Sequence, residues 1–192
     1  MVLPILSYGH PVLHQVCDEI PGDYPVEGLI ADMWATLYGA GGCGLAASQI
    51  GIPVKLFLVD SKLVFQQMNP ESRLVYFEDN NGIRDVFINA RITACSERCW
   101  ISEEACLSIP GLQYGTERPW SITIEYLDEF FKPHKRTFSG ITARMIQHEY
   151  EHTRGILYLD HLKPSKRRSL ASRLKKISRG QVKADYPMQF VK

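Results

Sequence analysis

The segment from residue 141 to residue 154, ITARMIQHEYEHTR, contains the pattern H-E-x-x-H, formed by His148, Glu149 and His152. Four residues make about one turn of an α-helix, so both imidazoles project from one face and can bind one metal ion. Glu149 lies a step around the helix, close to where a metal-activated water would sit. The pattern therefore predicts metal-assisted hydrolysis.

The apolar residues of the same segment indicate which way this face points. Ile141 and Met145 extend the stripe of His148 and His152, so we expect the face to point inward and both residues to line the site. The alternative is a solvated helix with two histidines by chance. Two buried neutral histidines beside a glutamate need a physical reason, and a metal ion supplies one.

Catalytic metal sites hold three protein ligands, so the pattern lacks one. Metzincin proteases have a histidine six residues past the second one, but this chain has Tyr158 there. Thermolysin-like proteases use a downstream glutamate, whereas the acids beyond residue 151 are Asp160 and Asp185. Asp160 and His161 remain open as ligands of a zincin-type protease. Upstream, Cys106 in SEEACLSIPG is the better candidate.

A glycine-rich stretch at residues 39–44, GAGGCG, fits the dinucleotide-binding pattern G-x-G-x-x-G. That pattern requires a strand before the glycines and a helix after them. Here a helical pattern precedes the glycines and a β-type run follows them, which disfavours a nucleotide site. The following LAASQ, with Gln49 at its end, needs another explanation.

Three of these motifs together resemble the peptide deformylase family. GCGLAASQ is similar to the family's G-x-G-L-A-A-x-Q, EACLS to its E-G-C-L-S, and QHEYEH to its Q-H-E-x-D-H. They occur in the family's order, and the resemblance covers most of residues 4–163. It implies antiparallel sheets packed around a central helix that carries H-E-x-x-H, with a further helix at the C-terminus.

The resemblance also implies a role for each matching residue. The metal ligands would be Cys106, His148 and His152, and Glu149 would be the general acid and base. Gln49 and the backbone N–H of Leu107 would stabilise the oxyanion. The backbone at Cys43 and Gly44 would hold the substrate peptide in an extended conformation.

The implied reaction removes the formyl group from the N-terminal formyl-methionine of nascent polypeptides and releases formate. The implied metal is ferrous iron in the cell, although Zn(II), Ni(II) or Co(II) suit the same ligands. Ala105 replaces the family's glycine, and we expect its methyl group to narrow the pocket for the first side chain. Glu151 replaces the family's aspartate, and we expect it to pair with Arg118.

The elements that must position these residues can be outlined from periodicity. We expect helices at 26–39, 141–154 and 164–179, strands at 54–60 and in VFINARITAC and SITIEYLDEF, and a loop at 61–86. Well-separated strands among few helices indicate an α+β fold in one catalytic domain, residues 1–192. Five cysteines at irregular spacing indicate reduced thiols, most of them buried, with no zinc clip at Cys95 and Cys99.

The charge is distributed unevenly along the chain. Residues 163–192 hold ten Lys and Arg and one acid, whereas residues 1–162 hold 12 basic and 20 acidic residues. We expect a stripe formed by Leu170, Leu174 and Ile177 to dock the last helix on the body, and the basic helix and tail, 163–192, to contact ribosomal RNA. A non-catalytic RNA-binding relic is the alternative, which the complete set of site residues disfavours. With no apolar stretch long enough for a membrane span, we expect a cytoplasmic protein.

Overall fold

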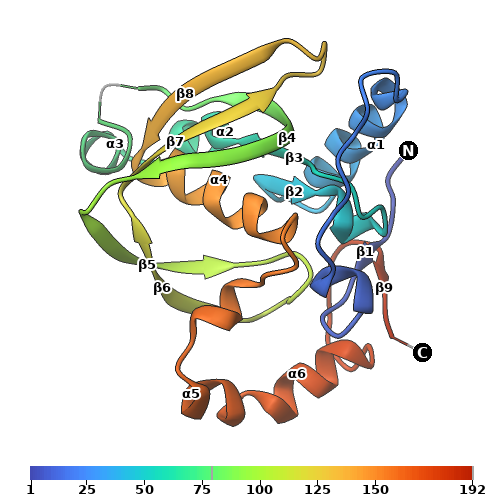
Figure 1. Ribbon diagram of the computed structural model, residues 1–192. Coiled ribbons are helices and arrows are strands. Elements are labelled where there is room, and N and C mark those ends of the chain that lie inside the picture. The colour runs from blue at the N-terminus through green and yellow to red at the C-terminus, as the bar shows by residue number, and fades with distance from the viewer. Residues whose placement is uncertain (79, 192) are drawn as a thin grey trace.

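The computed structural model describes residues 1–78 and 80–191 and has an α+β architecture (Figure 1). Five strands form an antiparallel sheet in the order β2-β3-β4-β7-β8, while β5 pairs with β6 and β1 pairs with β9. The strands are β1 (Ile5–Leu6), β2 (Gly44–Ala46), β3 (Leu56–Asp60), β4 (Arg84–Cys95), β5 (Cys99–Ala105), β6 (Gln113–Pro119), β7 (Ser121–Leu127), β8 (Pro133–Ser139) and β9 (Met188–Gln189).

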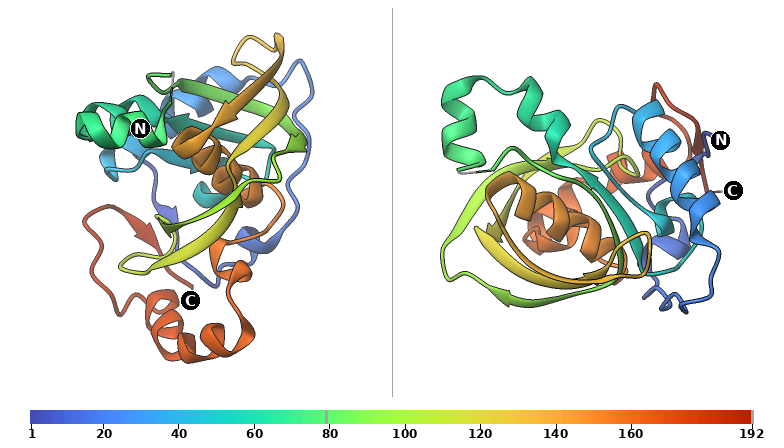
Figure 2. Two further views of the ribbon diagram at one scale, coloured as in Figure 1. Left: turned by 90° about the vertical axis from the view of Figure 1, so that its left-hand side faces the viewer. Right: turned by 90° about the horizontal axis from the view of Figure 1, so that it is seen from above.

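Helix α4 lies between the five-stranded sheet and the β5–β6 hairpin (Figures 1 and 2). Three short 3₁₀ helices, η1 (Pro11–His14), η2 (Ala47–Ile50) and η3 (Tyr158–His161), connect other elements. The α-helices are α1 (Val26–Gly39), α2 (Ser61–Gln67), α3 (Pro70–Tyr76), α4 (Gly140–His152), α5 (Pro164–Ser169) and α6 (Ala171–Ser178). The predicted fold class, with a central helix carrying H-E-x-x-H, is confirmed.

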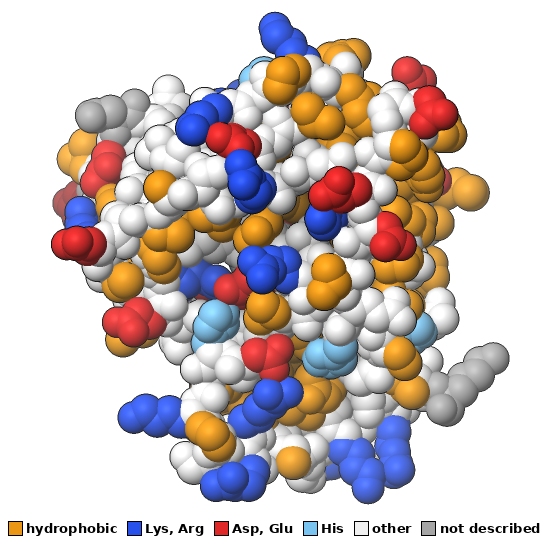
Figure 3. All heavy atoms as spheres, viewed as in Figure 1, with side chains coloured by type: hydrophobic (Ala, Val, Ile, Leu, Met, Phe, Trp, Pro, Cys, Tyr) orange, Lys and Arg blue, Asp and Glu red, His pale blue; other side chains and the backbone are white. Residues whose placement is uncertain are grey.

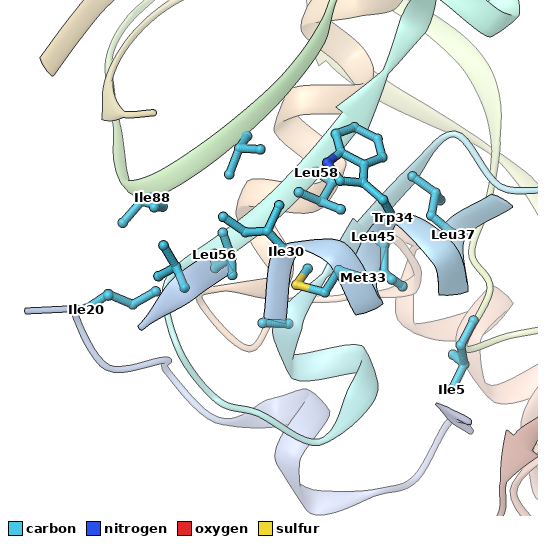
Figure 4. Packing of buried hydrophobic residues seen from close by; sticks show 13 residues of the cluster. Ile5, Ile20, Ile30, Met33, Trp34, Leu37, Leu45, Leu56, Leu58 and Ile88 are labelled. Atoms are coloured by element: carbon cyan, nitrogen blue, oxygen red, sulfur yellow. The ribbon is translucent and has the colours of Figure 1, made fainter. Parts of the chain in front are cut away.

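Strand β3 is buried on both faces and separates two parts of the core. Leu56 and Leu58 pack in one cluster with residues of α1, and Leu58 lies beside Trp34 (Figure 4). Phe57 and Val59 point to the opposite face and pack in the cluster that contains Ile146 of α4. Side chains alternate along a strand, so one short apolar run anchors α1 and α4 to the same sheet.

Helix α4 begins at a backbone position that only glycine fits. Gly140 has a φ of 59°, and a Cβ there would overlap the carbonyl oxygen of Tyr76. Its N–H donates to the carbonyl of Trp120 at 2.8 Å. The start of α4 is thereby fixed beside α3 and at the junction of β6 and β7.

Two predictions of secondary structure were wrong. The expected loop 61–86 contains α2 and α3, whose first turns are capped by Asp60, which accepts from Leu63 N–H, and by Asn69, which accepts from Ser72 N–H. Asn69 followed by a proline was a helix-start signal that the sequence analysis overlooked. The expected helix 164–179 is divided into α5 and α6 at Leu170, whose N–H bonds to the carbonyl only three residues back.

The C-terminal helices dock through apolar residues and expose basic ones. Leu170, Leu174 and Ile177 are buried in one core cluster, as their spacing predicted. Lys and Arg side chains gather at the bottom of the space-filling view, over α5 and α6 (Figures 1 and 3). Within the described residues, no helix is both long and apolar enough to cross a bilayer.

Candidate active site

The H-E-x-x-H residues are buried in the last two turns of α4. The exposed fractions of His148, Glu149 and His152 are 9%, 5% and 1%. This helix is enclosed on several sides, because β2, β3, β7 and β8 pack against it. The histidines therefore face the protein interior, as the sequence analysis expected.

Cys106 reaches the same point from the loop that joins β5 to β6. Its Sγ lies 3.3 Å from His152 Nε2. The ligand atoms of Cys106, His148 and His152 all lie within 4.8 Å of one another, and all three residues are buried. One thiolate and two imidazoles so close together are a donor set suited to a divalent transition metal.

A carboxylate that the sequence analysis did not assign orients one of the imidazoles. Glu104 Oε2 lies 2.9 Å from His148 Nδ1. With Nδ1 donating to the carboxylate, Nε2 is left to face the other two ligands. Position 104 is two residues before the cysteine in the E-x-C motif, so the motif itself carried this signal.

Glu104 is held as an anion by two buried arginines. Arg118 Nη2 donates to Glu104 Oε2 at 2.9 Å, and Arg144 Nη1 donates to Oε1 at 2.6 Å. Burial alone would raise the pKa of Glu104, but hydrogen bonds from His148 and Arg118 outweigh it and hold the pKa far below its usual range. Glu104 is therefore a permanent acceptor for His148.

Arg118 joins this cluster to the far side of α4. Its guanidinium makes two contacts of 2.9 Å with the carboxylate of Glu151, in addition to its contacts with Glu104. Glu151 also lies 2.9 Å from His161 Nε2. Although burial opposes the shift, hydrogen bonds with His161 and Arg118 lower the pKa of Glu151. One arginine thus links the β5–β6 hairpin to helix α4.

Glu149 has different surroundings from Glu104. Its Oε2 is buried without a hydrogen-bond partner among the described residues. Burial raises its pKa to about 7, with the nearby charge of Glu104 adding to the effect. A Cβ at Gly44 would overlap Glu149 Oε1, so the glycine of β2 leaves the space that the carboxylate needs.

Gln49 in η2 points its amide N–H groups at the ligand cluster. Its Oε1 accepts from Ala46 N–H at 2.8 Å, which fixes the orientation of the amide. Its Nε2 lies 3.5 Å from Cys106 Sγ and 3.3 Å from Ser108 Oγ. The side chain of Gln49 is therefore a donor held beside Cys106.

These groups open into a cleft of about 830 Å³. Of the residues predicted to bind substrate, Cys43, Gly44 and Ala105 line the cleft. The prediction was wrong for Ile141 and Met145, which do not line it; Met145 packs against the cluster around Phe57 and Ile146 instead. Helix α4 is buried on several faces, so the stripe of His148 and His152 alone did not show which of its residues line the cleft.

A larger hollow of about 950 Å³ lies elsewhere, between the N-terminal segment and strands β4 and β7. Exposed ion pairs border it, including those of Glu125 with Arg91 and with Lys135. Among the described residues its lining has no cysteine, and its one imidazole, His134, is partly exposed and paired with Asp128. The smaller cleft is therefore the candidate active site.

The downstream ligand candidates are engaged elsewhere. Asp160 Oδ2 accepts from Leu157 N–H at 2.8 Å, and its Oδ1 pairs with Arg167 at 2.8 Å. His161 pairs with Glu151. The geometry therefore favours Cys106 as the third ligand over either downstream residue.

The remaining cysteines are free thiols, as expected, but not all are buried. Cys17 is buried, whereas Cys95 and Cys99 are exposed, contrary to the expectation that most would be small core residues. Both lie at strand ends, where β4 finishes and β5 begins. Burial raises the pKa of Cys43 to about 11, so this thiol stays protonated near neutral pH.

Known proteins share both the sequence and the fold. A family model described as polypeptide deformylase matches residues 2–168. A peptide deformylase of Christiangramia forsetii is 42% identical over 193 residues, covering 99% of this chain and 96% of the relative. Another, of Flavobacterium psychrophilum, is 40% identical over 195 residues, covering 100% and 98%.

Solved structures agree with the sequence relatives. The peptide deformylase of Ehrlichia chaffeensis has a TM-score of 0.81 at 28% identity, covering 94% of this chain and 99% of that one. The enzyme of Legionella pneumophila has a TM-score of 0.76 at 31% identity, covering 94% and 98%. The resemblance drawn from three motifs is confirmed. The chain belongs to the polypeptide deformylase family, the hydrolases that remove the N-terminal formyl group from polypeptides.

Proposed function

We propose that Cys106, His148 and His152 hold one divalent metal ion for this reaction. The observation that carries the proposal is the convergence of their three ligand atoms within 4.8 Å, beside a buried carboxylate. When bound, the metal supplies Lewis acidity for activating water and polarising the formyl group. Ferrous iron is the metal proposed for the cell, and zinc, nickel or cobalt fit the same donors.

Glu149 is proposed to move the proton. A carboxylate whose pKa is about 7 can accept a proton from the attacking water and return it to the leaving amine near neutral pH. Its buried, unpartnered Oε2 is available for that transfer. Gly44 in β2 has no side chain, and this leaves room for the Glu149 carboxylate beside the substrate.

The other cleft residues are proposed to bind the substrate and the developing charge. The Gln49 amide and the Leu107 N–H would donate to the oxyanion formed when water attacks the formyl carbon. The backbone at Cys43 and Gly44 would hold a formyl-methionyl peptide in extended form, since β2 is at the edge of the five-stranded sheet. Ala105 would border the pocket for the first side chain.

Formate release tests the whole proposal. The protein is purified anaerobically, its metal content is measured, and formate is quantified after addition of formyl-Met peptides. We expect turnover that rises with the fraction of sites holding metal. Cleavage of internal peptide bonds without formate release would favour the zincin-type alternative and contradict the proposal.

We also propose that the exposed basic face of α5 and α6 binds ribosomal RNA, placing a cytoplasmic enzyme where nascent chains emerge. Single-sign charge on an otherwise acidic chain supports this. The residues to reverse to glutamate are four in the exposed class, Arg168, Lys175, Lys176 and Arg179. Arg173 is kept, because it donates to the Gly111 carbonyl at the cleft.

Co-sedimentation with ribosomes tests this surface. We expect binding by the wild type to fall steeply between about 50 and 200 mM salt and to disappear on reversal of the four charges. Activity on short formyl peptides should be unchanged, since none of the four lines the cleft. Equal binding by the wild type and the variant would contradict the proposal.

A further inference from the structure

The segment that follows α6 returns to the body of the protein instead of continuing as a free tail. The N–H groups of Ile5 and Ser7 donate to the carbonyls of Pro187 and Gln189, each at 2.9 Å, so β9 lies parallel to β1. At the other end, Gln181 N–H donates to the Lys176 carbonyl at 2.9 Å. Figure 1 shows this red segment running from α6 to the side of β1.

Between these anchors, four consecutive residues, 183–186, line the active-site cleft. They face a cleft that also contains Cys106, Leu107 and Glu149. The sequence analysis treated this stretch as part of a basic tail, because its single acid and its tyrosine carry no recognisable motif. The structure makes it a wall of the site.

Tyr186 connects this wall to the catalytic loop. Its hydroxyl donates to the carbonyl oxygen of Leu107 at 2.7 Å. The ring packs against the core cluster formed by α1 and β3, which fixes where the hydroxyl lies. Burial raises the pKa of Tyr186 to about 12, so the hydroxyl remains a donor throughout the neutral range.

The hydrogen bond from Tyr186 to Leu107 restrains a short turn that other backbone hydrogen bonds also hold. Ile109 N–H donates to the Cys106 carbonyl at 2.9 Å, and Tyr8 N–H donates to the Ser108 carbonyl at 2.8 Å. The bond from Tyr186 fixes the peptide unit between Leu107 and Ser108. The Leu107 N–H belongs to the preceding peptide unit, between Cys106 and Leu107. The direction of this N–H depends on the φ and ψ angles of Leu107, which the bond from Tyr186 restrains.

We propose that Tyr186 is a positioning residue for catalysis, which holds Leu107 so that its N–H points at the developing oxyanion. This rests on the proposed function of Leu107. A preorganised donor stabilises the transition state more than the bound substrate. Tyr186 acts through Leu107 and touches no reacting atom.

Replacing Tyr186 by phenylalanine removes the hydroxyl and keeps the ring. We expect kcat for formyl-Met peptides to fall about tenfold with little change in KM. A misdirected donor should lose only part of the transition-state stabilisation that is lost when the donor is removed. Tyr24→Phe is the matched control. Tyr24 packs on the same core cluster but does not line the cleft, so this variant should match the wild type.

A second readout follows the contact without using activity. In the Zn(II)-loaded protein, the ¹³C carbonyl shift of Leu107 should move upfield in Tyr186→Phe, the direction for a lost hydrogen bond, and the Leu107 amide signal should move with it. Tyr24→Phe should move neither. Metal content and melting temperature are measured on every sample, so that a loss of metal or fold is recognised.

The results separate this inference from the function on which it rests. An unchanged kcat in Tyr186→Phe, with active wild type, overturns the positioning role and leaves the proposed function intact. A raised KM with unchanged kcat also overturns it, because the hydroxyl would then serve binding alone. No formate release from metal-loaded wild type overturns the proposed function and this inference together.

Discussion

Two buried glutamates flank His148 and have opposite environments. Glu104 contacts two arginines and the imidazole, and these hold its pKa far below the usual range. Glu149 lies on the cleft side, one of its oxygens has no hydrogen-bond partner within residues 1–78 and 80–191, and burial raises its pKa to about 7. Burial is common to both, so the neighbouring cations make the difference.

The contrast separates two uses of a carboxylate, one on strand β5 and one on helix α4. A carboxylate whose pKa is held far below its usual range stays ionised near neutral pH and can orient an imidazole, as Glu104 does for His148. A carboxylate that changes its protonation near neutral pH can transfer protons, which is the role proposed for Glu149. The same cluster extends through Arg118 to Glu151, so the fixed charges form the structural side of the site.

The largest effect on stability should come from Arg118→Ala. This change leaves Glu104 and Glu151 without their shared cation, and breaking a buried pair costs about 3 to 5 kcal/mol. Urea denaturation measures the loss. Arg91→Ala, which removes an exposed partner of Glu125, is the control and should change stability by less than about 1 kcal/mol. Equal losses would show that the buried cluster contributes no more than a surface pair.

Opposite pH dependences should distinguish the two glutamates in metal-free protein. The folded pKa of Glu104 is depressed, so its stabilisation is present above its usual pKa and is lost as the pH falls; Glu104→Gln should destabilise at pH 7 and progressively less toward pH 3. The folded pKa of Glu149 is raised from 4.5 to about 7, so its ionisation disfavours folding as the pH rises across that window.

Glu149→Gln should therefore gain stability relative to wild type between pH 4.5 and 7, by about 2 to 4 kcal/mol, and gain no more above that range. Unfolding free energies measured across pH 3–8 test both variants. Parallel curves for Glu104→Gln and Glu149→Gln would mean that the two environments do not differ as described.

A smaller effect is expected where Ala105 borders the cleft. Removing its exposed methyl group in Ala105→Gly should raise kcat/KM several-fold for substrates with a bulky first side chain and leave small ones unaffected, since one methylene in a pocket is worth about 1 to 3 kcal/mol at most. A series of formyl peptides that differ in the first residue measures this. A uniform change across the series would show that the methyl group points away from the pocket.

The smallest effect should come from His161, at the edge of the buried cluster. Its hydrogen bond with Glu151 raises the pKa of His161, so its stabilisation is present below its usual pKa and is lost as the pH rises through the shifted value. The imidazole is 37% exposed, which limits the effect of His161→Gln to less than about 1 kcal/mol. Melting temperatures at pH 5.5 and pH 9 should differ from wild type only at the lower pH.

The residues that meet in the candidate site were predictable because short motifs fix their types and order. The helix at 141–154, the α+β class and the docking of Leu170, Leu174 and Ile177 followed from periodicity, whereas the central place of that helix followed from the family resemblance. The hairpin β5–β6 did not, since its strands carry charged residues that look solvated until Glu104 and Arg118 are seen to be buried together. Long-range pairing of charges leaves no local pattern to read.

The part of the cleft wall formed by the C-terminal segment could not be predicted from the sequence, for a related reason. Tyr186 lies 79 residues from Leu107, and pairing of β9 with β1 joins the two ends of the chain. A two-residue strand has no readable period. The basic composition of residues 163–192 predicted an exposed surface, which holds for α5 and α6. In the segment beyond them, exposed residues alternate with half-buried ones, and Tyr186 is one of the half-buried ones.

The central claim is that one cluster holds the metal while a separate carboxylate moves the proton. Metal content and formate release, measured together on anaerobically purified Cys106→Ser and Glu149→Gln, test it most directly. We expect Glu149→Gln to keep its metal and lose turnover by about 10²- to 10⁴-fold, and Cys106→Ser to lose both. A metal-free Glu149→Gln, or a Cys106→Ser with full metal and activity, would contradict the account.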